Sequence, residues 1–264
     1  MLELDEYLPL LAECIRRIPP ELTVHRLTGD GAKRHLVAPL WPADKKRVLN
    51  AVAARFRQED VVQGSRRALP PETEALDVVS ETMAPLGTAP RSRVHAEGLW
   101  HQVVHGWIAS RGPDGVSLWF QRRAFTKRDF PGQYDLAVGG HVDAGEDWRA
   151  AMARELREEL GLTPDPARLQ YLGLCRRETD AGAFHDREFG RVFLLWDDRP
   201  DFRPGPEVAS MVRLPLAAFR AAAAGAPWAD GFRADGTPVR IFSWQWAGKP
   251  VDFETLVLPA LERA

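Results

Sequence analysis

The stretch from Gly140 to Leu162 reads GHVDAGEDWRAAMARELREELGL, and it is the part of the chain that decides the fold. Glu155, Glu158 and Glu159 stand at positions i, i+3 and i+4, which a helix places on one face. Two carboxylates about 4 Å apart repel each other by about 4 kcal/mol at an effective dielectric constant near 20. Mg²⁺ and Mn²⁺ take hard oxygen ligands and also bind phosphate groups. The pattern therefore predicts a metal-binding helix face.

The rest of the stretch is typical of a helix that docks on a sheet after a glycine-rich loop. Met152, Leu156 and Leu160 fall on a second, apolar face of the same helix. Glycines in the loop let the backbone approach a ligand and offer a carbonyl group to a metal. Gly161 follows the helix, where a left-handed cap favours glycine.

A solvent-exposed charged face, with Arg154 bridging to Glu158, is the alternative interpretation of this helix. The spacing of the restricted positions argues against it, because so many of them rarely coincide by chance. These positions are Gly140, Glu146, Arg154-Glu155-Leu156, Glu158-Glu159 and Gly161-Leu162. The segment resembles the Nudix box at every specified position. The resemblance implies an α+β fold, the Nudix α/β/α sandwich with a mixed sheet.

The resemblance also implies an activity. A Nudix pyrophosphohydrolase cleaves a phosphoanhydride bond in a nucleoside diphosphate derivative or another organic diphosphate, by attack of a metal-activated water. The implied metal ligands are Glu155, Glu158, Glu159 and the carbonyl group of Gly140, with Mg²⁺ or Mn²⁺ as the cofactor. Arg154 joins the three glutamates as a catalytic candidate, because it would orient them, and Glu146 would brace the site. Glu155 is a candidate acceptor for the water proton.

The similarity extends over about residues 74–215 to the isopentenyl-diphosphate-isomerase-like branch of the Nudix superfamily. The runs HAEGLWHQVVHGWI, QRRAFTKRDFPGQYDLAVGGH and HDREFGRVF carry it. Isomerases of that branch hold a metal with residues outside the box. The matching positions here are His95, His101, His141, Asp186 and Glu188. Strand-end histidines and a polar loop before a strand are the alternative interpretations, so a second metal at these positions stays open.

One departure from the isomerase pattern argues against isomerisation. The catalytic cysteine of isomerases lies two residues before the histidine of the metal site, and this chain has Gly139 at that place. Neither Cys14 nor Cys175 is near it in the sequence. Isomerases also usually depart from the full hydrolase box, which this chain retains. An isomerase-like enzyme and a non-catalytic, nucleotide-sensing Nudix module remain the two alternatives to a hydrolase.

Basic residues upstream of the box are candidates for substrate binding, because arginine makes bidentate contacts with phosphate. They are Arg122, Arg123, Lys127 and Arg128. A solvated strand end is the alternative interpretation. The organic group of the substrate stays open, since the box specifies only the chemistry at the diphosphate.

The composition argues against several other classes of protein. The chain is 45% hydrophobic and 27% charged, with a formal net charge of −2, so no basic stripe favours nucleic acid. Cys14 and Cys175 lie outside any CxxC pattern, which disfavours a disulfide framework or a zinc-thiolate site and favours the cytoplasm. We expect no signal peptide and no membrane span, which would need roughly 20 apolar residues.

Three regions are expected along the chain. Residues 1–70 form an N-terminal helical or mixed region of open role, with helices at 4–18 and 43–58 and HLVAPLW as a candidate strand. Residues 71–225 form the Nudix domain, and residues 226–264 form a C-terminal extension packed on it. The expected partner is a small organic diphosphate, and a homodimer is one candidate assembly.

Turn and periodicity signals predict the elements of the second and third regions. LDVVS and PLGTA are expected to form a hairpin, and QVVHGWIAS and VSLWFQRR another, joined by RGPDG. LQYLGLCRRE, GRVFLLWDD and IFSWQW are further expected strands. LPLAAFRAAAAG is expected to be a helix ending at Gly225, and FETLVLPALERA a terminal helix.

Overall fold

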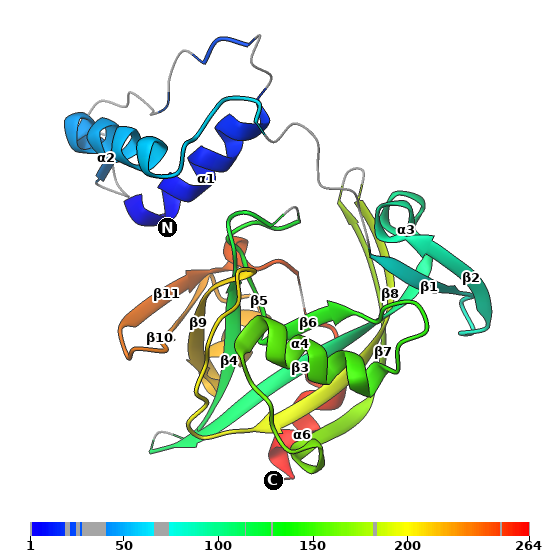
Figure 1. Ribbon diagram of the computed structural model, residues 1–264. Helices are drawn as coiled ribbons and strands as arrows, with labels where there is room; N and C mark the ends of the chain where they lie inside the picture. Colours follow the sequence, from blue (N-terminus) through cyan, green and yellow to red (C-terminus); the bar gives the residue numbers. More distant parts are fainter. Residues whose placement is uncertain are drawn as a thin grey trace. The chain divides into compact units, whose positions relative to one another are not determined.

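Two compact units divide the chain, at Met1–Pro71 and Glu72–Ala264 (Figure 1). The structure is a computed structural model. It describes residues 2–18, 22–24, 27, 41–65, 74–113, 115–127, 129–181, 184–248 and 250–263. No helix within these ranges is both long enough and apolar enough to cross a membrane.

The first unit is a small helical body. Helix α1 spans Leu4–Arg17, a short 3₁₀ turn spans Trp41–Ala43, and helix α2 spans Lys45–Gln58. Their apolar faces meet in a small core around Leu4, Val48 and Val52. The two helices predicted here are confirmed. Of the candidate strand HLVAPLW, only Trp41 lies within the described residues, and it belongs to the 3₁₀ turn.

The second unit is built on one large sheet (Figure 1). Its strands are β1 Ala75–Val79, β2 Pro85–Pro90, β3 Trp100–Gly112, β4 Gly115–Arg123, β5 Tyr134–Leu136, β6 Val138–His141, β7 Leu169–Ala181, β8 Phe184–Trp196, β9 Val208–Pro215, β10 Trp228–Arg233 and β11 Pro238–Phe242. The order along the sheet is β11-β10-β9-β4-β3-β1-β2, with β5 on β4, β6 and β8 on β3, and β7 on β8. Strands β3 and β8 pair in parallel, and the other pairs are antiparallel. The predicted mixed sheet is confirmed.

Strand β3 shows why the sheet is covered on both faces. Its side chains alternate, as successive residues of a strand do. Val104 and Ile108 enter a core shared with helix α4, which spans Trp148–Leu160. Trp107 and Ala109 enter a second core on the opposite face.

That second core is built from the later part of the chain. Helix α5, Leu216–Ala223, supplies Phe219, and the terminal helical segment supplies Phe253 and Leu261. The sheet is thus enclosed between helices, which is the α/β/α arrangement expected.

Helix α4 has a cap at each end, and the predicted end at Gly161 is confirmed. The Asp147 carboxylate accepts hydrogen bonds from the backbone N–H groups of Arg149, at 2.9 Å, and Ala150, at 3.2 Å. Gly161 ends the helix at φ 68° and ψ 18°, in the left-handed region. A side chain there would also meet Arg203, whose Cβ would lie 2.7 Å away. The position therefore needs glycine for two reasons.

Three predicted elements differ in their details. IFSWQW is only partly strand, because Gln245 turns back to accept a hydrogen bond from the Phe242 N–H, and Ser243–Gln245 forms a 3₁₀ turn. The first two residues of LPLAAFRAAAAG complete strand β9. The terminal helix begins as a π-helical segment, Phe253–Val257, and continues as α6, Leu258–Glu262.

Helix α3, Arg91–Glu97, was not predicted. It is seven residues long, which is too short to show an apolar period. A further 3₁₀ turn, Pro166–Arg168, precedes β7.

We predict that replacing Leu156 by Ala destabilises the second unit by about 2–5 kcal/mol, because the side chain is 1% exposed in the core beneath helix α4. The adjacent change Arg157→Ala is the control. The Arg157 side chain is 61% exposed, and its contact with Glu158 is long, at 3.4 Å. We therefore expect the free energy of unfolding to change by no more than about 0.5 kcal/mol. Urea unfolding followed by tryptophan fluorescence measures both, and equal losses in the two variants would contradict this assignment of the helix faces.

Candidate functional site

The three box glutamates line one cavity of about 560 Å³ beside helix α4. Glu159 is the most buried of them, and its carboxylate accepts hydrogen bonds from the Gln121 side chain at 3.1 Å and from the Gly139 N–H at 3.2 Å. Glu155 is largely buried, whereas the Glu158 side chain is 53% exposed at the rim. Helix α4 thus presents all three carboxylates to the same cavity.

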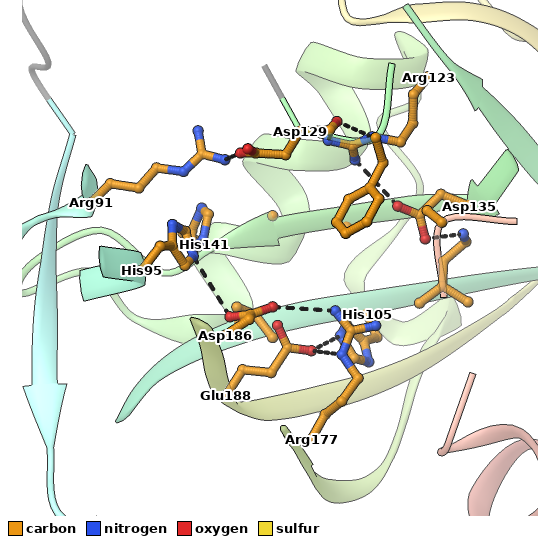
Figure 2. Close-up of a pocket in the computed structure, with 16 residues that line it drawn as sticks. Arg91, His95, His105, Arg123, Asp129, Asp135, His141, Arg177, Asp186 and Glu188 are labelled. Atoms are coloured by element: carbon orange, nitrogen blue, oxygen red, sulfur yellow. Dashed lines mark hydrogen bonds and ion pairs between the residues drawn. The ribbon is translucent and has the colours of Figure 1, made fainter. Parts of the chain in front are cut away.

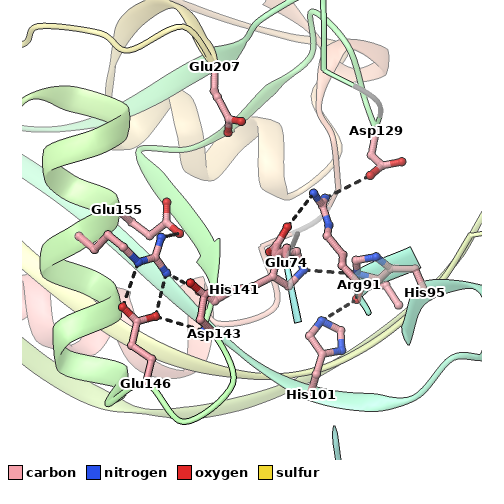
Figure 3. A network of polar contacts seen from close by, with 12 residues as sticks. Glu74, Arg91, His95, His101, Asp129, His141, Asp143, Glu146, Glu155 and Glu207 are labelled. Atoms are coloured by element: carbon pink, nitrogen blue, oxygen red, sulfur yellow. Dashed lines mark hydrogen bonds and ion pairs between the residues drawn. The ribbon is translucent and has the colours of Figure 1, made fainter. Parts of the chain in front are cut away.

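Burial raises the pKa of Glu159 to about 8 and that of Glu155 to about 7, and their mutual repulsion contributes at Glu159. Glu207 lies across the same cavity and adds to the repulsion on both (Figure 3). Carboxylates in this arrangement favour a bound cation, because a cation replaces the water that burial removes.

Arg154 joins helix α4 to the loop before it. Its Nε and Nη2 atoms donate to the two carboxylate oxygens of Glu146, each at 2.9 Å, and Nη2 also donates to the His141 carbonyl oxygen at 3.0 Å. Its Nη1 atom donates to Glu155 at 2.7 Å. The Arg154 contact lowers the pKa of Glu146. This bidentate pair fixes the loop against the helix.

Gly140 lies directly against the carboxylate of Glu155. A Cβ atom at position 140 would lie 2.1 Å from Glu155 Cδ, closer than any real contact. The absent side chain leaves the backbone and the carboxylate side by side. Hard oxygen donors therefore converge here, and the residues of the box fit a divalent metal of the Mg²⁺ or Mn²⁺ type.

A second cluster unites the histidines that the isomerase-like pattern singled out. The rings of His95, His101 and His141 lie 5.2 Å apart, centroid to centroid, in every pair. The Nε2 atoms of His95 and His141 are 3.4 Å apart. Asp186 Oδ1 lies 3.6 Å from Nε2 of both His95 and His101.

The electrostatics of this cluster also suit a metal. Burial lowers the pKa of His95 to about 3 and that of His101 to about 4, so both imidazoles are neutral at neutral pH, the form in which histidine can bind a metal. The Leu99 carbonyl lies 3.1 Å from Nδ1 of His101, which leaves Nε2 facing the cluster. Among the described residues, His101 Nε2 and Asp186 Oδ1 are buried without a hydrogen-bond partner. Such atoms fit a cation between them.

Glu188 has different neighbours from Asp186. One of its oxygens lies 2.7 Å from Arg177 Nε and 3.2 Å from His105 Nε2 (Figure 2). Although burial opposes ionisation, these two groups hold the pKa of Glu188 well below its usual value. Glu188 is therefore ionised and fixed beside the histidine cluster.

A smaller cavity of about 110 Å³ adjoins the box cavity, and Figure 2 shows its lining. The two cavities share a wall formed by Arg91, Arg123, Gly139, Gly140 and His141. The smaller cavity is mostly polar: its apolar lining residues are Val103, Phe130, Leu136 and Ala247.

Two of the predicted substrate-binding residues reach the cavities. Arg123 lies on the shared wall, and Lys127 lines the box cavity, where it pairs with Glu207. Arg122 lines neither cavity. It is buried, and its Nε donates to the Gly132 carbonyl at 3.0 Å, so its place is in the packing of the loop. Arg128 lies outside the described residues.

The sequence pattern did not identify Arg91, Asp129 or Glu207. Arg91 begins helix α3 and pairs with Asp129 and with Glu74, each at 3.3 Å. Glu207 follows a loop fixed to the end of α4, where the Gly205 N–H donates to the Glu159 carbonyl at 2.8 Å. No periodicity or spacing marks these residues, because each reaches the site through a long-range contact.

A model of the NUDIX domain matches residues 100–235, and a model of the Radical_SAM C-terminal domain matches residues 1–58. An uncharacterised Nudix hydrolase of Clostridium acetobutylicum is 34% identical over 123 residues, which are 47% of this chain and 59% of that protein. Nudix hydrolase 3 of Arabidopsis thaliana is also 34% identical, over 46% of this chain and 16% of its own length.

An isopentenyl-diphosphate Delta-isomerase of Kocuria rhizophila is 32% identical over 157 residues, which are 59% of this chain and 86% of that protein. The crystal structure of DR0079 from Deinococcus radiodurans is 30% identical, with a TM-score of 0.42 over 58% of this chain and 90% of its own. This chain thus spans only part of the Nudix hydrolases that it matches. Because the NUDIX model covers more than half of the 264 residues, and the box lies within it, the chain belongs to the Nudix family.

Proposed function

We propose that this chain is a metal-dependent Nudix hydrolase that cleaves a phosphoanhydride bond in a small organic diphosphate, such as a nucleoside diphosphate derivative, by attack of water at phosphorus. The observation that carries the proposal is the convergence of Glu155, Glu158 and Glu159 on one open cavity with basic residues on its wall. This chemistry needs carboxylates that bind a cation and positively charged side chains that bind a phosphate. The cavity has both kinds of side chain.

The acids would hold the cation. Glu155, Glu158, Glu159 and the Gly140 carbonyl group are the proposed ligands, with Mg²⁺ or Mn²⁺ as the ion. When bound, such an ion neutralises phosphate charge and lowers the pKa of a water molecule. Arg154 keeps Glu155 in place through Nη1, and Glu155 is the proposed acceptor of the water proton.

The basic side chains would hold the diphosphate. Arg123 and Arg91 lie on the wall between the cavities, and Lys127 lies in the box cavity. Both arginines contact Asp129: Arg91 pairs with its carboxylate, and Arg123 donates to its carbonyl oxygen. A phosphate group can take over the Arg91 contact with Asp129, because it is also an anion with several acceptor oxygens. The diphosphate would therefore lie on this wall, with the organic group in the smaller cavity.

The histidine cluster supports a second metal. His95, His101, His141 and Asp186 are its proposed ligands, with Glu188 beside them. This site faces the smaller cavity, next to the proposed position of the organic group.

Diphosphate isomerisation is the second candidate function, and the histidine cluster together with the isomerase relatives favours it. Two observations weigh against it. Position 139 carries no thiol. The smaller cavity is lined largely by charged groups, such as Arg177 and Asp135, which suit a polar organic group better than a hydrocarbon. A non-catalytic sensing module is disfavoured because all the box glutamates are retained.

We expect Glu159→Gln to lower kcat by about two orders of magnitude or more, because Glu159 is the most buried of the acids that face the cation. The control is Glu262→Gln, at an exposed position in α6. Product analysis over a panel of nucleotide sugars, dinucleotides, coenzyme A, damaged nucleoside triphosphates and isopentenyl diphosphate, with Mg²⁺ and Mn²⁺ compared, measures the effect. Activity that survives Glu159→Gln, or isomer as the product, would reject the proposal.

Two neighbouring glycines provide a sharper test. We expect Gly140→Ala to fold but to lose most activity, because the new methyl group displaces the Glu155 carboxylate, whose Cδ would lie only 2.1 Å away. Gly139→Ala is the matched control, since the nearest atom to a Cβ there is the Val104 carbonyl oxygen at 4.0 Å. Steady-state kinetics compares the two, with melting temperature as the check on folding. Equal activities would show that the contact with Glu155 does not matter.

The second metal is tested by counting ions. We expect His101→Asn to reduce the number of metal ions bound per chain by removing the site at the histidines. We expect Glu159→Gln to affect a different site, because Glu159 lines the box cavity. His185→Asn is the control: this half-exposed histidine pairs with Asp180 outside the cluster. Elemental analysis after equilibrium dialysis against Mn²⁺ gives the ratio of metal ions to protein chains. An unchanged ratio in His101→Asn would refute a metal at the histidines.

A further inference from the structure

A third group of metal-binding side chains lies beneath the smaller cavity, apart from the box and from the three clustered histidines. It consists of His105 on β3, Cys175 on β7 and Asp252 just before the terminal helical segment. One ligand atom from each lies within 4.8 Å of the others. Figure 2 shows His105 at the floor of the cavity, beside Glu188 and Arg177.

The separations match those of ligands around one ion. His105 Nδ1 lies 3.7 Å from Cys175 Sγ and 3.3 Å from Asp252 Oδ2. Tetrahedral Zn²⁺, with bonds of about 2.0–2.1 Å to nitrogen and oxygen and about 2.3 Å to sulfur, places nitrogen and sulfur roughly 3.6 Å apart and nitrogen and oxygen roughly 3.3 Å apart.

Neighbouring side chains orient His105 and Asp252 through hydrogen bonds, as the neighbours of metal ligands usually do. The other ring nitrogen of His105 faces Glu188 at 3.2 Å, which is the carboxylate–histidine contact typical of metal sites. The Trp107 Nε1–H donates to Asp252 Oδ2 at 2.9 Å. Asp252 is 1% exposed, and its second oxygen, Oδ1, is buried without a hydrogen-bond partner in the described part of the chain. An unpartnered buried carboxylate oxygen is costly, and a cation bound at Oδ2 would neutralise the charge that the two oxygens share.

Space for a fourth ligand lies next to the group. A void of about 10 Å³, close to the volume that one water molecule requires, is lined by His105 and Asp252 together with Tyr134 and Trp246. Nitrogen, sulfur and carboxylate donors with a water molecule form a set that favours Zn²⁺ over the Mg²⁺ expected at the box.

We propose that His105, Cys175 and Asp252 bind a thiophilic divalent cation of the Zn²⁺ type, distinct from the ions of the box and of the clustered histidines. The ion connects strands β3 and β7 to the segment that leads into the C-terminal helix. It also fixes His105, which faces Glu188, so it holds one side of the cavity floor in place. The alternative occupant of this position is a proton, which would make His105 an imidazolium between Asp252 and Glu188.

Cobalt substitution tests the proposal, because a thiolate bound to Co²⁺ gives a charge-transfer absorption in the near ultraviolet that oxygen and nitrogen ligands do not give. The chain has two cysteines, and Cys14 is exposed in the first unit. In the full chain carrying Cys14→Ser, Cys175 is the one thiol left. We expect metal-free Cys14→Ser protein to develop the band on titration with Co²⁺, to saturate it at one ion per chain, and to lose it when Zn²⁺ is added.

Two further changes in the same background locate the ion. We expect Asp252→Asn to weaken the Co²⁺ affinity measured from the band by about tenfold or more. Glu155→Gln should leave the band unchanged, since Glu155 lines the box cavity, and it separates this proposal from the proposed hydrolysis. Cobalt binding to Cys14→Ser without the band would show that Cys175 binds no metal and would overturn the proposal. A band insensitive to Asp252→Asn would overturn the assigned ligand set.

Discussion

Glu155 and Glu159 cannot move apart, because the helix that carries them is fixed by its opposite face. Met152, Leu156 and Leu160 are at most 1% exposed against the sheet, so any rotation of α4 would expose apolar surface. The two carboxylates are therefore held together in a partly dry space, where burial raises the pKa values of both. Apolar packing on one side of the helix thus sustains electrostatic repulsion on the other, and a bound cation would relieve that repulsion.

The wall between the two cavities carries alternating charges. Arg91 pairs with Asp129, Arg123 donates to the carbonyl group of Asp129, and Arg123 also pairs with Asp135 at 3.2 Å. These basic groups already have partners in the protein, so a phosphate group would bind there by exchange. Exchange favours a ligand that offers several acceptor oxygens at once, because a single acceptor would only replace one contact by an equal one. The wall therefore suits a diphosphate better than a monoanion.

The last part of the chain also contributes to the site. Phe253, Val257 and Leu261 pack in the core on the face of the sheet opposite α4. Asp252, at the start of this segment, reaches His105 and Trp107 on β3. A segment that reads as a plain terminal helix therefore supports the floor of the smaller cavity, because its apolar packing brings one buried carboxylate to the central strand.

Local rules explain how much could be predicted. Helical spacing placed Glu155, Glu158 and Glu159 on one face, and Gly161 marked the end of the helix, since both effects act within a few residues. The resemblance to a known pattern singled out His95, His101 and His141, which helix α3 and strands β3 and β6 then brought together. Arg122 and Arg123 are neighbours on β4, and the pairing of β4 with β9 shifts register between them. Their different surroundings could not be assigned without the sheet.

The family and the box helix, with its three acids on one face, could be identified from the amino-acid sequence alone, because they depend on short-range spacing. The tertiary structure decided which distant residues complete the site. Arg91, Glu207 and Asp252 come from a short helix, a loop and the C-terminal segment, and each is placed by hydrogen bonds or packing across many residues of chain. No local pattern encodes such contacts, since their positions follow from strand pairing and from the burial of apolar faces on both sides of the sheet.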